Sequence, residues 1–227
     1  MVNIFTNKTV LVSGGVGSIG SEIVWQLLKF KPKQIRIFDN RETELFHMQQ
    51  LLLAYPNLRF LVGDIKDKER LNTAMENVDI VFHCAALKHV PMCEYNPFEA
   101  VKTNVYGTQN VIECALANNV SKVINISTDK VTNTINTMGA TKLLAERLVA
   151  SAQYYKGDKK TIFSSVRFGN VLGSRGGIID LFKKQIERGE SVTITNPDMT
   201  RFVMSVPQAV SLVLKTTEEM QVEKYLY

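Results

Sequence analysis

The feature that most constrains the fold of this chain is a regular alternation of strand-like and helix-like segments. Short apolar runs typical of buried strands lie at residues 8–13, 34–39, 58–63, 79–84, 122–127 and 161–168. Segments with helical periodicity lie at residues 18–30, 41–54, 67–76, 97–117, 138–155, 177–188 and 206–219. Alternation of this kind predicts an α/β fold with a Rossmann-type, doubly wound parallel sheet.

The alternation becomes irregular after Gly169, where glycines and prolines interrupt the pattern. We therefore expect a sheet domain at residues 1–168. Residues 169–227 should form part of a smaller lobe, a helix that returns to the sheet, and a last strand at residues 222–227.

Composition and charge exclude several classes of function. The chain has 27 Lys and Arg against 22 Asp and Glu, and the cationic residues are scattered, so we expect no nucleic-acid partner and a substrate that can carry phosphates. The spacing of Cys84, Cys93 and Cys114 predicts no metal site, redox motif or disulfide framework. The first residues show no signal peptide, and no apolar run reaches the ~20 residues of a membrane span. These observations predict a cytoplasmic protein.

A glycine-rich turn joins the first predicted strand to the first predicted helix. Gly14, Gly17 and Gly20 form a G-x-x-G-x-x-G pattern, and Ser18 and Ile19 open the helix. Glycines at such a turn let the backbone approach a pyrophosphate, and the helix N-terminus favours its negative charge. An ordinary strand-to-helix turn is the alternative, but the strand and helix context favours a dinucleotide site contacted by all five residues.

Acidic residues at two later strand ends fit the rest of a dinucleotide. Asp39 suits the adenosine ribose hydroxyls and favours NAD, whereas Arg41 could instead pair with the 2′-phosphate of NADP. Asp64 could accept from the adenine amino group or act as a helix N-cap, or do both. We expect Ile65 to line the same site, as well as Ala85 and Ala86 after the fourth strand.

Polar residues also follow the fifth predicted strand. Thr128, Asp129 and Lys130 stand where open α/β sheets place ligands, although an Asp-Lys pair can also be a cap or a surface pair. Met138 and Lys142 share one helix face. Their spacing resembles the Tyr-x-x-x-Lys of short-chain dehydrogenases/reductases, with methionine in place of tyrosine. Methionine carries no exchangeable proton, so Met138 is either a core residue of an inactive enzyme or part of a site that works differently.

Longer motifs make the resemblance specific. Residues 85–91, 94–97, 127–130, 138–142, 166–171 and 199–202, with Asn104, Gly107 and Thr108, closely resemble the nucleotide-sugar 4,6-dehydratases of polysaccharide biosynthesis. These enzymes belong to the extended short-chain dehydrogenases/reductases, and the nearest branch is the UDP-N-acetylglucosamine 4,6-dehydratases. The resemblance covers essentially the whole chain. Family members continue for roughly another hundred residues, so we expect this chain to lack the C-terminal part.

The resemblance implies an NAD(P)-binding domain at residues 1–168, a partial substrate-binding region at 169–227 and a redox-neutral lyase. A bound NAD would take hydride from C4 of the sugar and return it to C6 after water has left. Asp129 would be the acid for the C6 hydroxyl and Lys130 the base at C5, and lysine there points to a UDP-N-acetylhexosamine. Thr128 would hold the C4 hydroxyl and Lys142 the nicotinamide ribose. Lys88, Asn170 and Arg201 would contact the nucleotide sugar; Arg175 is a weaker candidate.

Two other functions stay open. A nucleotide-sugar 4-epimerase uses the same transient oxidation at C4 but does not need the Asp129–Lys130 pair. A catalytically silent dinucleotide-binding module would need only the glycine turn. We also expect a homodimer or higher homo-oligomer, paired through the helices at 97–117 and 138–155.

Overall fold

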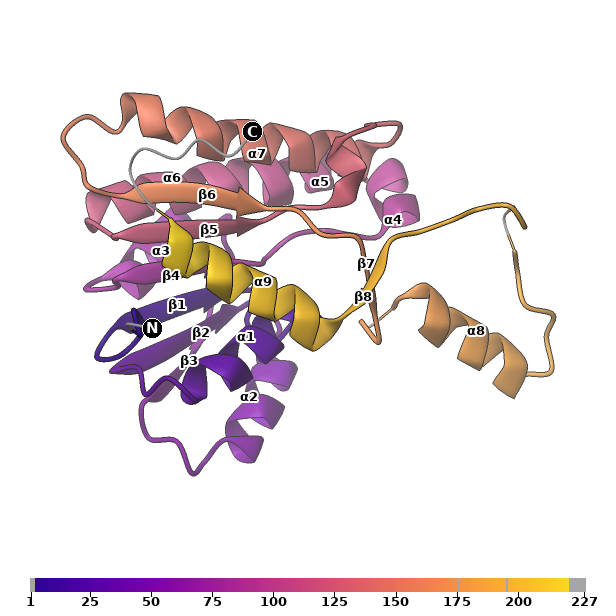
Figure 1. Ribbon diagram of the computed structural model, residues 1–227, viewed down its shortest axis with the longest axis horizontal. Coiled ribbons are helices and arrows are strands. Elements are labelled where there is room, and N and C mark those ends of the chain that lie inside the picture. Colours follow the sequence, from indigo (N-terminus) through magenta and orange to yellow (C-terminus); the bar gives the residue numbers. More distant parts are fainter. Residues whose placement is uncertain (1–2, 175, 195, 221–227) are drawn as a thin grey trace.

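A computed structural model describes residues 3–174, 176–194 and 196–220 of the chain. At its centre lies a six-stranded, fully parallel sheet in the order β3-β2-β1-β4-β5-β6 (Figure 1). The strands are β1 (Thr9–Ser13), β2 (Gln34–Asp39), β3 (Leu58–Val62), β4 (Ile80–His83), β5 (Lys122–Ile126) and β6 (Ile162–Val166). This confirms the predicted Rossmann-type sheet. The strand order reverses between β1 and β4, the point at which such sheets bind ligands.

Helices cover both faces of the sheet. They are α1 (Ser18–Leu28), α2 (Glu42–Leu51), α3 (Lys68–Met75), α6 (Gly107–Ala117), α7 (Thr137–Tyr155) and α9 (Val206–Glu219). Val10 and Val12 of β1 join one apolar cluster with α1, α2 and α9, whereas Leu11 joins a second cluster with α3, α6 and α7. This division follows from the alternation of side chains along a strand. Burial on both faces explains why these strands read as continuous apolar runs.

The helix predicted at residues 97–117 is interrupted. It consists of α5 (Pro97–Ala100), a π-helical turn η1 (Val101–Tyr106) and α6, and it follows a short helix α4 (Val90–Tyr95) that the sequence analysis did not predict. A π-helical turn inserts extra backbone into a helix, often at a functional site. Here it carries the buried Asn104, whose contacts explain its position.

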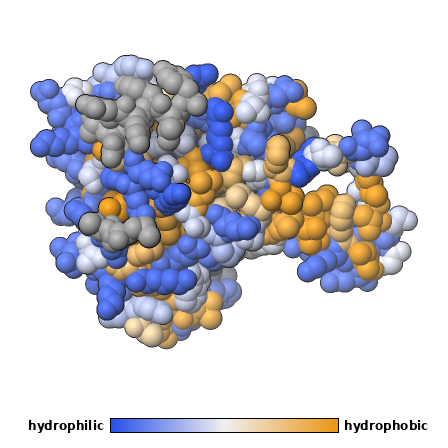
Figure 2. Space-filling view, in the orientation of Figure 1, coloured by the Kyte–Doolittle hydropathy of each residue, from blue (hydrophilic) through white to orange (hydrophobic). Residues whose placement is uncertain are grey.

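The region after β6 is built differently. Strands β7 (Asn170–Leu172) and β8 (Val203–Ser205) form a separate parallel pair, and α8 (Ile178–Glu187) extends away from the sheet (Figure 1). No residue of α8 is buried, and Figure 2 shows hydrophobic residues along it. Then α9 returns to the sheet, beginning with a capping box between Ser205 and Gln208. The strand predicted at 222–227 lies outside the described residues.

Candidate active site

A cleft of about 880 Å³ opens at the carboxyl ends of the strands. It lies between the sheet domain and the segment formed by β7, α8 and β8, hereafter the lobe. Of the predicted site residues that the structure describes, all except Asp129 line the cleft: Gly14, Gly17, Ser18, Ile19, Gly20, Asp39, Arg41, Asp64, Ile65, Ala85, Ala86, Lys88, Thr128, Lys130, Met138, Lys142, Asn170 and Arg201. Residues more than 180 positions apart in the chain therefore meet at one site. The volume suits a dinucleotide or a nucleotide sugar better than a small metabolite.

The glycine turn forms a cradle with no room for side chains. A Cβ at Gly14 would lie 2.7 Å from the Ala85 nitrogen, and one at Gly20 would lie 2.3 Å from the Gly14 carbonyl oxygen. Gly14 also has a φ of 65°, a conformation that favours glycine. The first turn of α1 has no acidic residue, so its backbone N–H groups face no carboxylate of their own helix. This geometry fits the pyrophosphate of a dinucleotide.

Asp39 holds the turn from the end of β2. Its buried carboxylate accepts from the Val16 backbone N–H at 3.2 Å and from the Arg41 backbone N–H at 3.2 Å. The Arg41 side chain also pairs with this carboxylate, with Nε at 3.3 Å from Oδ1. The positive charge that could favour a 2′-phosphate is therefore already balanced by Asp39, which favours a ribose with free hydroxyls.

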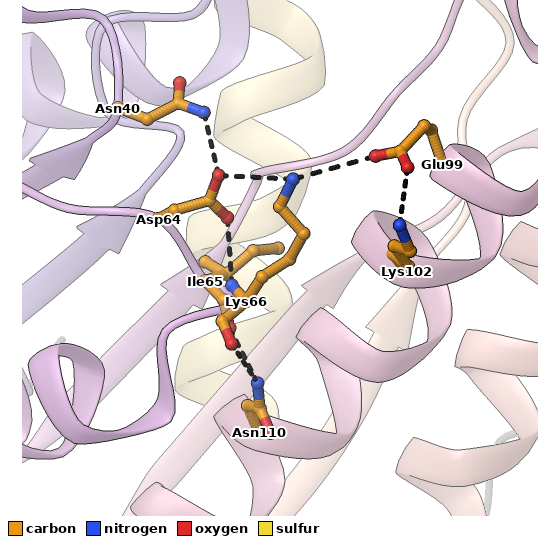
Figure 3. A network of polar contacts seen from close by, with 7 residues as sticks. All are labelled: Asn40, Asp64, Ile65, Lys66, Glu99, Lys102 and Asn110. Atoms are coloured by element: carbon orange, nitrogen blue, oxygen red, sulfur yellow. Dashed lines mark hydrogen bonds and ion pairs between the residues drawn. The ribbon is translucent and has the colours of Figure 1, made fainter. Parts of the chain in front are cut away.

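Asp64 belongs to a polar network beside Asp39, at the end of the neighbouring strand β3 (Figure 3). Its carboxylate accepts from the Asn40 amide at 3.1 Å and from the Lys66 backbone N–H at 2.9 Å. The Lys66 ammonium lies 3.6 Å from Asp64 Oδ2 and 3.9 Å from Glu99 Oε2, so it connects the loop after β3 with α5. Asp64 also lines the cleft, where its carboxylate can accept a hydrogen bond from an amino group.

The interpretation of Asp64 as a helix N-cap is wrong. Helix α3 begins at Lys68, and its N-cap is Asp67, whose side chain accepts from the Arg70 backbone N–H at 3.0 Å. Asp64 lies three residues before this N-cap, and its carboxylate instead accepts from the Lys66 backbone N–H in the loop that precedes α3. Ile65, next to it, packs against Gly107, where any side chain would overlap it.

A buried polar network behind the cradle was not predicted. His83 Nδ1 lies 2.8 Å from the Ser13 hydroxyl, and its Nε2 lies 3.0 Å from the Thr108 hydroxyl, which donates to the Asn104 carbonyl. Burial, and secondarily the charge of Lys142, lowers the pKa of His83 to about 3. The neutral ring therefore accepts from Ser13 and donates to Thr108, and it fixes the residue that precedes the glycine turn. A histidine inside a strand-like run was the available sequence signal.

Asn104 extends this network to α7, which carries Met138 and Lys142. Its amide accepts from the Leu87 N–H at 2.8 Å and donates to the Leu87 carbonyl and the Thr141 hydroxyl, both at 3.0 Å. It thereby fixes the loop after β4 relative to α7. The π-helical turn brings this buried side chain into register with both partners.

Thr128, Asp129 and Lys130 form a connected group at the end of β5. The Thr128 hydroxyl donates to Asp129 Oδ1 at 2.9 Å, and the Lys130 ammonium lies 3.0 Å from the same oxygen. Burial raises the pKa of Asp129, but hydrogen bonds from Lys130 and Thr128 outweigh it, so that pKa is lowered. Asp129 does not line the cleft itself and reaches it through its two neighbours. The group can pass protons along short hydrogen bonds.

Met138 and Lys142 lie one turn apart on α7, as their spacing predicts. Met138 is buried against Cys93, Ala100 and Val90 while it also lines the cleft, so it is both a core residue and a wall of the site. The buried Lys142 ammonium donates to the Ile126 carbonyl. Burial lowers the pKa of Lys142 to about 8, although the neighbouring Cys84 and Glu146 raise it.

Glu146 is a second residue that the sequence analysis missed. It lies one helical turn after Lys142, accepts from the Ser127 hydroxyl at 2.8 Å and forms a two-pronged ion pair with Arg167. The ion pair joins α7 to the end of β6, and the Ser127 contact joins it to the end of β5. This arrangement fixes the strand end that carries Thr128. Glu146, Ser127 and Arg167 are far apart in the sequence, so no rule based on residue spacing could have predicted their contacts.

The lobe contributes Asn170 and Arg201, and the loop after β4 contributes Lys88. Asn170 lies at the start of β7, and its amide oxygen accepts from the Lys130 ammonium at 3.1 Å. Arg201 is exposed at the cleft and donates to the Thr200 carbonyl at 2.8 Å. Lys88 lines the cleft, and the neighbouring His89 packs against Gly176, which supports a structural role for that histidine. Arg175 lies outside the described residues.

Within residues 3–174, 176–194 and 196–220, no three His, Cys, Asp or Glu side chains are grouped so that they could hold a metal ion. None of the helices in that part of the chain is both long enough and apolar enough to span a bilayer.

Comparison with known proteins identifies the chain's relatives. Residues 10–226 match the family described as "Polysaccharide biosynthesis protein". Over 94% of its length the chain is 62% identical to an uncharacterized membrane protein of Methanocaldococcus jannaschii. Over 95% it is 45% identical to a UDP-N-acetylglucosamine 4,6-dehydratase (inverting) of Campylobacter jejuni, and over 94% it is 43% identical to a UDP-glucose 4-epimerase of Rickettsia rickettsii. The chain spans 64–65% of the length of these relatives.

Solved structures agree with the fold. The structure of Pen from Bacillus thuringiensis superposes with a TM-score of 0.91 at 48% identity, over 94% of this chain and 66% of that one. MoeE5, solved with UDP-glucose and NAD, superposes with a TM-score of 0.80 at 27% identity, over 92% of this chain and 71% of that one.

Proposed function

This chain belongs to the polysaccharide biosynthesis protein family, and from that premise we propose that its cleft catalyses the 4,6-dehydration of a nucleotide sugar. We infer UDP-N-acetylglucosamine as the substrate and NAD as the resident cofactor. The observation that carries the proposal is the Asp129 carboxylate, which accepts from Thr128 and lies 3.0 Å from the Lys130 ammonium, while Thr128 and Lys130 line the same cleft as the glycine cradle. A relative named as such a dehydratase supports the assignment.

Cofactor binding is assigned to the sheet domain. Gly14, Gly17 and Gly20 would approach the pyrophosphate, Asp39 would accept from the adenosine ribose, and Asp64 would accept from the adenine amino group. Lys142 would donate to the nicotinamide ribose. The chemistry that NAD supplies when bound is reversible hydride acceptance, from C4 of the sugar and back to C6. The neighbour MoeE5, crystallised with NAD, supports this choice.

Proton transfer is assigned to the group at the end of β5. Because the Thr128 hydroxyl donates to Asp129, its oxygen can accept from the C4 hydroxyl of the sugar. The C4 proton would pass through Thr128 to the Asp129 carboxylate, which later gives it to the C6 hydroxyl as that group leaves as water. Lys130, after its ammonium has released one proton to solvent, would remove the C5 proton and return it to C5 at the end. This route needs no proton carrier at Met138.

Incubation with UDP-N-acetylglucosamine and NAD tests the proposal. Mass spectrometry should show a product lighter by one water, and Asp129→Asn should abolish it. A substrate with deuterium at C4 should yield product with deuterium at C6. No loss of water by the wild-type protein at any pH would contradict the assignment.

The 4-epimerase is the second candidate, because a relative at 43% identity carries that name. The Asp129–Lys130 pair argues against it, since inversion at C4 requires no proton transfer at C5 or C6. Deuterium that stays on C4 of an inverted sugar would establish epimerisation. Tight NAD binding without turnover of any nucleotide sugar would instead support a silent binding module.

We also propose a homodimer or higher homo-oligomer formed through the helices at 97–117 and 138–155. Large side chains on these segments are exposed, among them Tyr106 at 60%, Leu144 at 49% and Tyr155 at 52%. Large apolar side chains exposed on neighbouring helices support an interaction site there. Light scattering should show a multiple of the chain mass, and a monomer would contradict the proposal.

A further inference from the structure

The geometry points to Asn170 as a positioning residue that ties Lys130, the proposed C5 base, to the lobe. This inference rests on the proposed function and adds a role to Asn170, which the resemblance implicates only in substrate contact. It starts from the contact between two residues 40 positions apart: the Lys130 ammonium lies 3.1 Å from the Asn170 amide oxygen.

The backbone of Lys130 is fixed, but its side chain is not fixed by packing. The N-terminus of α7 lies so close that a Cβ at Gly139 would be 2.9 Å from the Lys130 carbonyl oxygen. The Lys130 side chain, in contrast, is 34% exposed. The position of its nitrogen is therefore set by the two acceptors that hold it, Asp129 Oδ1 at 3.0 Å and Asn170 Oδ1 at 3.1 Å.

The two acceptors come from different parts of the molecule. Asp129 follows β5 in the sheet domain, whereas Asn170 opens β7 in the lobe. The Asn170 backbone N–H donates to the Phe202 carbonyl at 2.9 Å, and Gly169 lies so close to that carbonyl that no side chain fits. The position of the β7–β8 pair therefore determines where the amide of Asn170 lies.

The orientation of the amide follows from donor and acceptor chemistry. A lysine ammonium only donates, so the oxygen of Asn170 must face it, and the NH2 group must point the other way. The two acceptors hold the ammonium between the sheet domain and the lobe. When Asp129 takes up a proton during the proposed reaction, Asn170 is the acceptor that keeps Lys130 in place.

Differential acylation of lysines, read by peptide mass spectrometry, tests this inference without any turnover. Asn170→Leu has nearly the same size but no acceptor, and it should speed acylation of the partly exposed Lys130 about three- to tenfold, which corresponds to the loss of one typical hydrogen bond. Asn170→Asp keeps the acceptor and should leave the rate at or below that of wild type. Arg201→Gln, in the same lobe but without contact to Lys130, is the matched control and should not change it.

Equal acylation of Lys130 in Asn170→Leu and wild type would overturn the inference, as would equal acceleration in the Leu and Asp variants. The wild-type product assay distinguishes failure of the proposed function from failure of the inference about Asn170. Failure to form product contradicts the proposed function, whereas the acylation rates report on the contact between Asn170 and Lys130. Where turnover is present, Asn170→Leu should also lower kcat and alter its pH profile, effects that loss of a substrate contact alone would not produce.

Discussion

The sheet domain, which α9 joins, and the lobe formed by β7, α8 and β8 use apolar side chains in opposite ways. Ile23 on α1 is fully buried in the cluster that packs against the sheet, whereas Ile186 on α8 is 64% exposed. The sheet domain therefore stabilises its own fold and the cofactor cradle. The described part of the lobe gains little from internal packing, and its order depends on the β7–β8 pair and the contacts of Gly169 and Asn170 with the site.

The sheet domain and the lobe should also differ in what their residues do: Lys130 in the sheet domain should determine kcat, whereas Arg201 in the lobe should determine KM. The largest expected effect is therefore on turnover. Lys130→Met should lower turnover by about 10²–10⁴-fold, because it removes a positioned proton-transfer group. NAD affinity, measured by calorimetry, should be unchanged. Arg201→Gln in the lobe should instead raise KM about tenfold with kcat retained, through loss of a paired donor to a diphosphate. A kcat loss in the Arg201 variant equal to that of Lys130→Met would break the comparison.

Matched truncations test the difference in packing directly. Ile23→Ala should reduce the free energy of unfolding by about 2–5 kcal/mol, because it leaves a cavity in a closed core. Ile186→Ala on the exposed face of α8 should change it by about 0.5 kcal/mol or less. Urea unfolding followed by circular dichroism measures both values. Similar losses in the two variants would show that α8 is packed in solution.

Glycine substitutions test whether the glycine cradle is part of the NAD site. Gly20→Ala should cost about 3 kcal/mol, since the new Cβ would lie 2.3 Å from the Gly14 carbonyl oxygen, and it should abolish NAD binding. The control is Gly157→Ala, at a site with a φ of 59° and open space, which should cost about 1 kcal/mol and leave NAD affinity intact. Normal NAD affinity in Gly20→Ala would remove the cradle from the cofactor site.

The smallest expected effect concerns pH. Burial lowers the pKa of Lys142 to about 8 from 10.5, so between these values the unfolded chain binds more protons than the folded one. The contribution of Lys142 to the free energy of unfolding should therefore rise by about 1 kcal/mol from about pH 7 to about pH 9. Lys122 and Lys156, whose pKa values are also lowered by burial, add slopes of the same sign. The difference between wild type and Lys142→Met isolates Lys142, and identical slopes would contradict the prediction.

Patterns that are local in the sequence were sufficient to predict much of the fold and of the candidate site. The alternation of strands and helices predicted the sheet, and the helix at 206–219 has the predicted bounds. The glycine turn, Asp39 and the residues after β5 were found because their chemistry depends on neighbours within a few positions. The prediction of Asp64 as a helix cap was wrong because α3 begins at Lys68, close to the predicted start at residue 67, so that Asp67 and not Asp64 adjoins its first turn.

By itself, then, the sequence determined the fold class, the cofactor cradle and the identity of the polar residues at the end of β5. Only the tertiary structure determined which side chains hold the glycine cradle and these polar residues in position. The buried contacts of His83 and Asn104, the Glu146–Arg167 pair and the contact of Asn170 with Lys130 join residues from separate elements. The physical reason is that the alternation of segments specifies each strand and helix through local periodicity, whereas hydrogen bonds between distant side chains depend on distances that exist only after the sheet has formed.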